Sequence, residues 1–548
     1  MPPILNVNRR LFLSPANENG GDWMILLEVN SLKVMIQDRM LLDVEKLQVG
    51  KEDRIGLVGR NGSGKSTLLE VISGKRVPEE GSVSQHGSVE LLPQLKRTDT
   101  YKSGGEVTQE YINAAIARKS DLLLADEPTT HLDTKHIEWL EKKLKRWQGA
   151  LVLVSHDRVF LDAICTKIWE IDEGKIKEYK GNYSAYAEQK ELERKQHELA
   201  YEKYEKKKQQ LQGALELKER KAARATKTPK KVSASEASIT GAKPYFAKKQ
   251  KKLDKAAKAI ETRLEKLEKV EKLRELPSIK MNLPNEESFK GRIILRVEKV
   301  GGVIGERVLW KPVSFTVKGG EKLAIIGPNG SGKTTLIKKI LKGEKGILFT
   351  PAVRTGYFSQ NIETLDVDKT ILENVSSTSV QTESFVRTVL ARLHFFRDDV
   401  YKEVNVLSGG ERIKVALAKL FVSDINTLIL DEPTNFLDLE SVEALESLLQ
   451  EYEGTILFVS HDRRFIEKVG TKILAIENSE IQIFDGTYEE YKNYEPQEER
   501  DDLAEQKLLI ETKITEVLSR LSIEPSEALD REFQALLAEK RKIDLERE

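Results

Sequence analysis

Two glycine-rich segments of this 548-residue chain have the pattern G-x-x-x-x-G-K-[ST], which binds phosphate where it joins a strand to a helix. They are GRNGSGKS and GPNGSGKT, and each follows a strand-like run and precedes a helix-like one. The glycines let backbone N–H groups surround phosphate oxygens. Lys65 and Lys333 would reach the terminal phosphates, while Ser66 and Thr334 would ligate Mg²⁺. The predicted phosphate-binding residues are Gly59, Arg60, Asn61, Gly62, Ser63, Gly64, Lys65, Ser66 and Thr67, and Gly327, Pro328, Asn329, Gly330, Ser331, Gly332, Lys333, Thr334 and Thr335.

Paired carboxylates end two further apolar runs, LLLADEP and TLILDEP. Both runs predict buried strands, so the acids emerge where the strands end. Asp126 and Asp431 suit Mg²⁺, and Glu127 and Glu432 suit polarisation of an attacking water. The pattern therefore predicts hydrolysis of a phosphate bond at two metal-assisted sites.

A histidine follows another strand-like run in each half, in LVLVSHD and ILFVSHD. A histidine in such a place is by itself more often structural than catalytic. Here, however, His156 follows Glu127 by 29 residues, and His461 follows Glu432 by the same interval. We therefore expect both histidines to contact the terminal phosphate.

The segments KSGGE and LSGGE complete two sets of motifs that occur in the same order. P-loop, glutamine loop, SGGE, D-E-P and S-H-D in that order resemble the ATP-binding cassette (ABC) superfamily, whose members bind ATP between two cassettes. The resemblance implies that the P-loop of each cassette faces the SGGE segment of the other, so that ATP joins the halves and hydrolysis releases them. The additional ATP-binding residues that it implies are Ser408, Gly409 and Gly410 opposite Lys65, Ser103, Gly104 and Gly105 opposite Lys333, and the glutamine-loop residues Gln94 and Gln360.

The two halves differ mainly in one interval. Nine residues separate Gln94 from Ser103, whereas 48 separate Gln360 from Ser408, so the first cassette lacks most of its helical subdomain. Its SGGE segment also follows Lys102, where the family usually has leucine. Neither half has an aromatic residue where the family often stacks adenine. We therefore predict two unequal ATP sites.

The segment between the cassettes, residues 189–290, predicts two charged helices with narrow apolar seams, as in an antiparallel coiled-coil hairpin. A solvated spacer is the ordinary alternative for such a stretch. Residues 218–258, however, contain 14 Lys and Arg and three acids, so the positive charge gathers toward the tip at about 224–246. This polarity favours contact with polyphosphate. Two aromatic residues near the tip, Tyr245 and Phe246, could equally pack the loop against the second arm or stack on a base. The candidate RNA-contacting residues are Lys227, Lys230, Lys231, Lys243, Tyr245 and Phe246.

Composition excludes several classes of tandem ATPase. The formal charge is zero, with 89 basic and 89 acidic residues, and the single Cys165 excludes an iron–sulfur cluster or a cysteine-rich zinc site. No apolar run approaches the roughly 20 residues of a membrane span. We expect a cytoplasmic protein, with residues 1–23 as a leader outside the core and residues 496–548 as a helical extension.

The remaining pattern resembles the ABC-F family across residues 24–495, including the form DEPTxxLD in DEPTTHLD and DEPTNFLD. The predicted fold is α/β: two P-loop ABC domains, at 24–188 and 291–495, joined by the helical hairpin. The family binds ATP and Mg²⁺ and enters the E site of the 70S ribosome, where the hairpin reaches toward P-site tRNA and 23S rRNA. Off the ribosome we expect a monomer that pairs its own two cassettes.

The long tip, the reduced first helical subdomain and the C-terminal helices look most like the antibiotic-resistance branch, the Vga and VmlR group. That branch protects the peptidyl-transferase centre from lincosamides, streptogramin A and pleuromutilins. Two other hypotheses are a housekeeping ABC-F translation factor that rescues stalled ribosomes and the ATPase subunit of an importer. Ribosome co-sedimentation would separate the importer from the others, and drug susceptibility would separate the first two.

Overall fold

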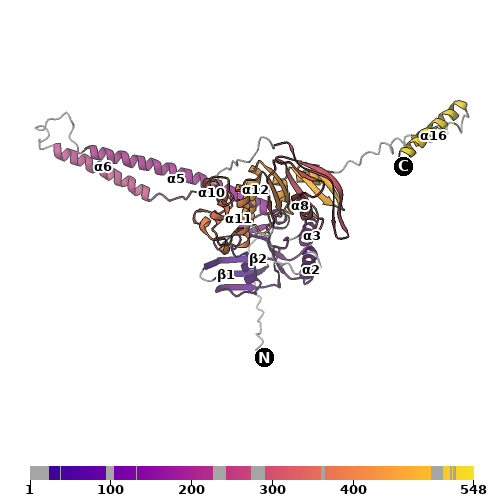
Figure 1. Cartoon of the computed structure of the whole chain (residues 1–548). Coiled ribbons are helices and arrows are strands. Elements are labelled where there is room, and N and C mark those ends of the chain that lie inside the picture. Colours follow the sequence, from indigo (N-terminus) through magenta and orange to yellow (C-terminus); the bar gives the residue numbers. More distant parts are fainter. Residues whose placement is uncertain are drawn as a thin grey trace. The chain divides into compact units, whose positions relative to one another are not determined.

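The computed structural model describes residues 24–36, 39–93, 104–130, 132–225, 242–272, 290–359, 365–494, 510–518, 521 and 526–547. They fall into two compact units, Met1–Asp485 and Gly486–Glu548, which are considered separately. The first unit contains two α/β cassettes and the long paired helices between them, which confirms the predicted fold class (Figure 1).

The first cassette is built on a six-stranded sheet in the order β5-β6-β7-β3-β8-β9, in which β9 alone runs antiparallel to its neighbour. A three-stranded antiparallel sheet in the order β2-β1-β4 accompanies it. The strands are β1 (Ile25–Ile36), β2 (Arg39–Gly50), β3 (Arg54–Gly59), β4 (Glu80–Gln85), β5 (Val89–Leu92), β6 (Leu122–Asp126), β7 (Ala150–Val154), β8 (Lys167–Asp172) and β9 (Lys175–Lys180). The helices are α1 (Lys65–Ile72), α2 (Gly104–Ala117), α3 (Thr134–Lys145) and α4 (Arg158–Ile164).

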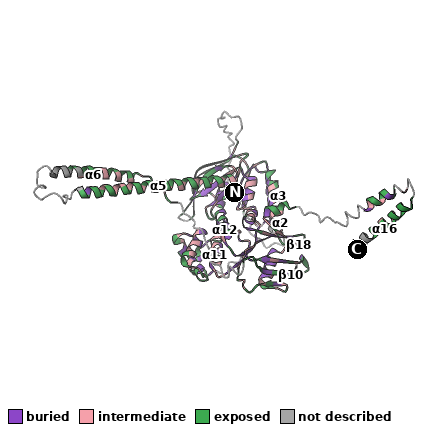
Figure 2. Ribbon diagram, turned by 90° about the horizontal axis from the view of Figure 1, so that it is seen from above, coloured by how far each residue is buried: buried purple, intermediate pink, exposed green. Residues whose placement is uncertain are grey.

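The core of this cassette lies on both faces of the six-stranded sheet. Leu122 and Leu124 of β6 pack with the small sheet and α1, whereas Leu123 and Ala125 pack with α3 and α4. Every residue of β6 is therefore buried. Figure 2 shows that buried residues gather in the interior of the first unit, whereas the hairpin helices α5 and α6 are largely exposed. Parallel strands covered on both faces are expected to be apolar throughout, which explains the sequence of this run.

The second cassette repeats this plan, with a six-stranded sheet in the order β14-β15-β16-β12-β17-β18 and a small sheet in the order β11-β10-β13. The strands are β10 (Ile293–Ile304), β11 (Arg307–Lys318), β12 (Lys322–Ile326), β13 (Ile347–Phe349), β14 (Thr355–Phe358), β15 (Thr427–Asp431), β16 (Thr455–Val459), β17 (Lys472–Glu477) and β18 (Glu480–Asp485). The helices are α8 (Lys333–Lys342), α9 (Ile371–Ser376), α10 (Glu383–Arg392), α11 (Gly409–Val422), α12 (Leu439–Glu451) and α13 (Arg463–Val469), with short 3₁₀ helices η2 (Arg397–Tyr401) and η3 (Val404–Val406).

The helical subdomain is the main difference between the cassettes. In the second cassette α9, α10, η2 and η3 lie between β14 and α11. In the described residues of the first cassette, no helix lies between β5 and α2. Residues 93–103 join β5 to α2, and of these only Pro93 is described, whereas 50 residues join β14 to α11.

Two long helices, α5 (Tyr183–Ala225) and α6 (Ala242–Glu265), lie side by side and form the hairpin (Figure 1). Helix α5 begins six residues before the predicted start at 189, because Tyr183 and Tyr186 pack against the end of the first cassette; the Tyr186 ring is 4.9 Å from that of Tyr179. Its 43 residues span about 65 Å at ~1.5 Å per residue, longer than the arm that the sequence predicts.

The predicted tip lies partly within a helix. Because α6 begins at Ala242, positions 243, 245 and 246 are helical rather than part of a loop, and Pro244 is tolerated in this first turn. Lys227, Lys230 and Lys231 lie outside the described residues, as do the side chains of the three helical positions.

The second unit contains α14 (Tyr488–Asn493), helical residues 510–518 and α16 (Glu527–Arg547). It begins at Gly486, before the extension predicted at 496–548. The predicted leader, 1–23, lies outside the described residues. Among the described residues, no helix is both long enough and apolar enough to span a membrane.

Candidate functional site

The two P-loops adopt a conformation that depends on glycine. Gly62 and Gly64 have φ values of 76° and 101°, and Gly330 and Gly332 have 75° and 101°. A Cβ atom on Gly332 would also lie 2.5 Å from the ring of Trp310. The left-handed backbone and the close packing against Trp310 together exclude a side chain at Gly332. The same turns direct the amides of each loop toward the start of α1 or α8.

The P-loop lysines lie inside these turns. Lys65 Nζ donates to the carbonyls of Gly59 and Arg60 at 2.6 and 3.0 Å. Lys333 Nζ donates to the equivalent carbonyls at 2.9 and 3.1 Å. Burial lowers the pKa of both ammonium groups. Each P-loop thus places an ammonium group, held by two backbone carbonyls, at the N-terminus of a helix, where a polyphosphate could bind.

A hydroxyl–carboxylate pair adjoins each lysine. Thr334 Oγ1 donates to Asp431 Oδ1 at 3.2 Å, and Ser66 hydrogen-bonds Asp126 in the first cassette. Burial is the main cause that raises the pKa of both carboxyls. Such hard oxygen donors are those that Mg²⁺ prefers when phosphate supplies its other ligands.

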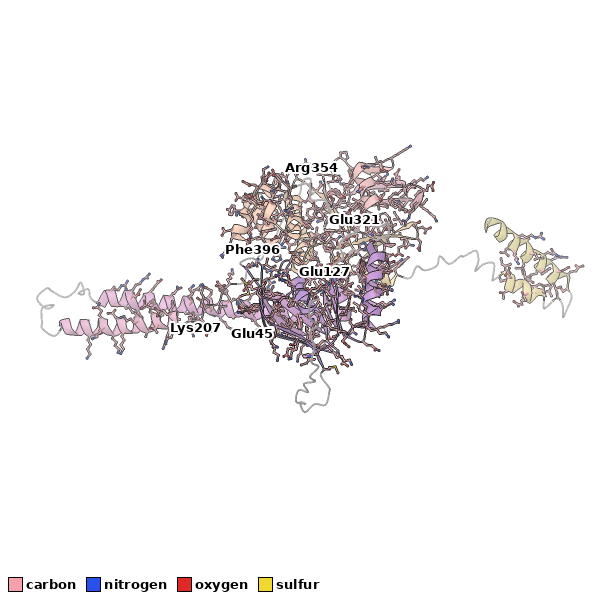
Figure 3. The ribbon with its side chains drawn as sticks, turned by 90° about the horizontal axis from the view of Figure 1, so that it is seen from below. Glu45, Glu127, Lys207, Glu321, Arg354 and Phe396 are labelled. Atoms are coloured by element: carbon pink, nitrogen blue, oxygen red, sulfur yellow. The ribbon has the colours of Figure 1, made fainter. Side chains whose placement is uncertain are left out.

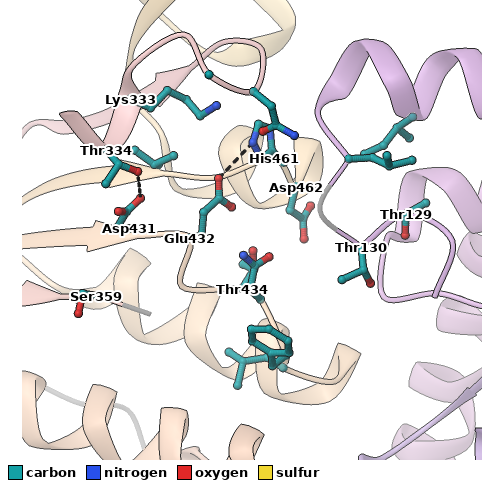
Figure 4. Close-up of a pocket in the computed structure, with 18 of the residues that line it drawn as sticks. Thr129, Thr130, Lys333, Thr334, Ser359, Asp431, Glu432, Thr434, His461 and Asp462 are labelled. Atoms are coloured by element: carbon teal, nitrogen blue, oxygen red, sulfur yellow. Dashed lines mark hydrogen bonds and ion pairs between the residues drawn. The ribbon is translucent and has the colours of Figure 1, made fainter. Parts of the chain in front are cut away.

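The next residue in each cassette is a glutamate in strained left-handed backbone, at φ 50° for Glu127 and 52° for Glu432. The strain is held by a backbone hydrogen bond from each glutamate to the strand that carries the histidine. His156 Nε2 lies 3.1 Å from Glu127 Oε1, and His461 Nε2 lies 3.3 Å from Glu432 Oε1 (Figure 4). The structure therefore brings together the glutamate and histidine that the sequence pairs only by spacing.

The environment of the second pair is strongly perturbed. Burial, with the neighbouring Asp431, raises the pKa of Glu432 to about 7. Burial, with Lys333, lowers the pKa of His461 to about 3. The histidine is therefore neutral at physiological pH, and its ring can donate one hydrogen bond and accept another.

The SGGE segment of the second cassette lies against the P-loop of the first. Ser408 caps α11 by accepting from the Glu411 N–H at 3.3 Å. A Cβ atom on Gly410 would lie 2.7 Å from the backbone oxygen of Phe436, so glycine is required there, and it would lie 2.9 Å from Asn61 Nδ2 of the opposite P-loop. Gly104 and Gly105 begin α2 in the first cassette, whereas Gln94, Ser103 and Gln360 lie outside the described residues.

Two aspartates that the sequence analysis did not assign also cross between the cassettes. Asp438 Oδ2 accepts from the backbone N–H of Asn61 at 2.9 Å, and Asp133 Oδ2 accepts from that of Asn329 at 2.9 Å. Each also caps the helix that follows it, α12 or α3. Both aspartates are the last residue of a DEPTxxLD segment and stand directly before a helix. An aspartate in that place indicates an N-cap, which is the only signal that the sequence gives for them.

A cavity of about 760 Å³ opens beside the second P-loop and is lined by both cassettes. Lys333, Thr334, Glu432 and His461 lie on one side, and Thr129 and Thr130 face them from the first cassette (Figure 4). Glu127 lies between the two halves of the molecule in Figure 3. Ile304 and Leu309, which the sequence analysis did not identify, supply apolar lining of the kind that holds a base.

Comparisons with known proteins place the chain in a family. The family described as ABC transporter matches residues 42–100 and 310–435, and a second model of that description matches residues 169–281. The chain is 33% identical to the ribosome protection protein VmlR of Bacillus subtilis (strain 168), over 95% of this chain and 98% of that protein. The chain belongs to the ABC-F family.

This ABC-F protein is therefore an ATPase with tandem cassettes. It is also 35% identical to the erythromycin resistance ATP-binding protein MsrA of Staphylococcus epidermidis, over 81% of this chain and 96% of that protein. Among solved structures, an archaeal ribosome recycling factor in complex with a ribosomal stalk protein matches with a TM-score of 0.57 and 19% identity, covering 84% of this chain and 91% of that one. At this identity the match supports the fold alone.

Proposed function

We propose that this ABC-F protein binds the ribosomal E site in its ATP-bound form and protects the peptidyl-transferase centre from lincosamide, streptogramin A and pleuromutilin antibiotics. The observation that carries the proposal is the similarity to VmlR, which extends over 98% of that protein and therefore includes the hairpin segment. Residues 169–281 also match a model of their own, so the hairpin is part of the family pattern.

The arrangement of residues in the two cassettes supports the following catalytic roles. Glu127 and Glu432 act as general bases toward the attacking water, and His156 and His461 orient the terminal phosphate. Ser66 with Asp126, and Thr334 with Asp431, would hold Mg²⁺, and the metal would neutralise charge on the phosphates. The SGGE glycines of the opposite cassette complete each site, so the cassettes must close for hydrolysis.

The charge on the hairpin supports RNA as the partner of its far end. Lys221 and Arg224 of α5 and Lys251, Lys252 and Lys255 of α6 are all exposed. In the described residues of the hairpin these cations lie near the predicted tip, where few acids accompany them. Phosphate contacts from such a cluster give strong, salt-dependent binding without need of base recognition. A ribosomal partner also implies a cytoplasmic location.

Co-sedimentation with 70S ribosomes tests the ribosome part of the proposal. A Glu127→Gln, Glu432→Gln double variant should remain bound in ATP, because closure persists when hydrolysis is blocked. Replacing Lys251, Lys252 and Lys255 by glutamine should weaken this binding. Replacing the same number of lysines nearer the cassettes, Lys203, Lys206 and Lys207, is the matched control. A double variant that stays in the supernatant would refute ribosome binding and favour the importer ATPase.

Drug susceptibility tests the protection part. A host that expresses the chain should tolerate the three drug classes, and deletion of residues 226–243 should abolish tolerance. Ribosome binding without any change in drug tolerance would favour the housekeeping translation factor that rescues stalled ribosomes.

A further inference from the structure

A buried arginine crosses from the first cassette to the second at a point that the catalytic motifs do not include. Arg158 begins α4, two residues after His156, and its side chain is fully buried. Its guanidinium forms a two-pronged ion pair with Glu446 of α12, with Nη1 3.1 Å from Oε2 and Nη2 against Oε1. Glu443 is on the same helix, and its Oε1 lies 3.6 Å from Arg158 Nη1. A fork of this kind fixes orientation as well as charge.

The internal repeat places a second arginine in the equivalent position. Arg463 begins α13, two residues after His461, and its Nη1 lies 3.1 Å from Glu141 Oε1 on α3 of the first cassette. Arg463 Nη2 lies 3.9 Å from Glu138 Oε1. Both arginines and all four of these glutamates are separated from their counterparts by 305 residues, as are the two catalytic-motif histidines. The contact is therefore made twice, once in each direction.

The first of these contacts joins two parts of one ATP site. Helix α12 begins at its cap Asp438, which binds the backbone N–H of Asn61 in the first P-loop. Two turns further along, Glu446 holds Arg158 and so the loop of His156. One helix of the second cassette thus contacts both the P-loop and the histidine loop of the first. When the cassettes separate, both contacts are lost together.

Energetics favour a role in alignment rather than in net attraction. A buried ion pair contributes little net stability because desolvation of both charges offsets their attraction. Removal of one partner is strongly destabilising, because it leaves the other charge buried. In the described residues Glu446 is 2% exposed and also pairs with Lys468 at 2.8 Å, while Asp462 Oδ2 lies 3.8 Å from Arg158 Nη2. The pair therefore raises the free energy of a closed state in which Arg158 and Glu446 do not meet. It changes the free energy of the correctly aligned closed state only slightly.

We propose that Arg158 and Arg463 are positioning residues of the ATPase, each aligning the histidine of its own site only when the opposite cassette has closed. Arg158 serves the site of Lys65 and His156, and Arg463 serves the site of Lys333 and His461. Hydrolysis is thereby coupled to complete closure. Arg158 is the more buried of the two, at 0% against 10% exposure, so its removal has the larger effect.

Steady-state ATPase kinetics of the full chain, without ribosomes or drug, test this proposal independently of the proposed function. Arg158→Met should lower kcat at the site of Lys65 by about tenfold or more, measured in a Glu432→Gln background that silences the other site, and Glu446→Gln should do likewise. The double variant should be no slower than the slower single variant, since the two side chains act as one unit. Arg158→Lys, which keeps the charge but not the fork, should recover part of the lost kcat.

The matched control is Arg387→Met on α10, whose partners Glu383 and Tyr401 both lie in the second cassette. Its kcat should equal that of the native protein. Thermal unfolding without nucleotide should be similar for all variants, because the pair forms across the interface. If Arg158→Met does not fold, Glu446→Gln decides the question. A native kcat in Glu446→Gln, or a double variant whose loss is the product of the single losses, would overturn the proposal.

Discussion

Asp438 provides the sharpest test of how ATP closes the cassettes, because its two oxygens have separate tasks. Oδ2 accepts from the Asn61 N–H of the opposite cassette at 2.9 Å, and Oδ1 accepts from the Ser441 N–H at 2.9 Å as the cap of α12. A hydrogen bond to a charged group contributes about 1.5–3 kcal/mol. A helix cap contributes about 1 kcal/mol. The first contribution acts on closure alone, and the second acts in the open and closed states.

In Asp438→Ala the ATP concentration that half-closes the cassettes should therefore rise by about 10- to 150-fold. Without nucleotide, the melting temperature of Asp438→Ala should fall only by the amount that loss of the α12 cap causes. Asp438→Asn, which keeps a cap and a neutral hydrogen bond, should fall between the alanine variant and the native chain. Although burial opposes ionisation, the bonds from Ser441 and Asn61 hold the pKa of Asp438 below its ordinary value. Its contribution should persist above about pH 4 and be lost as pH falls through the lowered pKa.

The assay is energy transfer between dyes on exposed positions of α3 and α10, titrated with ATP in the Glu127→Gln, Glu432→Gln background. Thr382→Ala is the matched control, since Thr382 caps α10 by accepting from the Phe385 N–H and lies within the second cassette. Closure of Asp438→Ala at the native ATP concentration would contradict this prediction. An equal shift of closure in Thr382→Ala would contradict it as well.

Three further results are expected. Glu127→Gln and Glu432→Gln should reduce ATP turnover unequally, because the two sites differ in signature and burial raises the pKa of Glu432 to about 7; equal losses of kcat would contradict this. Burial and a facing carboxylate raise the pKa of Asp157 to about 6, so closure takes up a proton. The ratio of closure affinity in the native chain to that in Asp157→Asn, which keeps the cap of α4, should rise about tenfold from pH ~7 to ~5. Gly332→Ala should abolish nucleotide binding at the second site, measured with a fluorescent ATP analogue, since its Cβ would overlap Trp310 at φ 101°.

Much of each ATP site was predictable because its parts are local in sequence. The P-loop depends on glycines within eight residues and on the helix that follows, and DEP and SHD each end an apolar run that forms a buried strand. The sequence also showed that the first cassette has a much shorter interval before its SGGE segment. The start of α5 was placed too late, because Tyr183 and Tyr186 belong to the aromatic packing of the first cassette rather than to the hairpin pattern.

The sequence predicts that there are two phosphate sites, which residues line their own half of each, and which segment carries the positive charge. Those features follow from spacing within one strand–loop–helix unit or from local composition. The contacts that cross the interface could be found only in the folded chain. Asp438 and Asn61 are 377 residues apart, and Arg158 and Glu446 are 288 apart. Partners at such separations meet only through the packing of whole cassettes, and neither a charged residue nor a helix cap indicates in sequence which distant group it will bind.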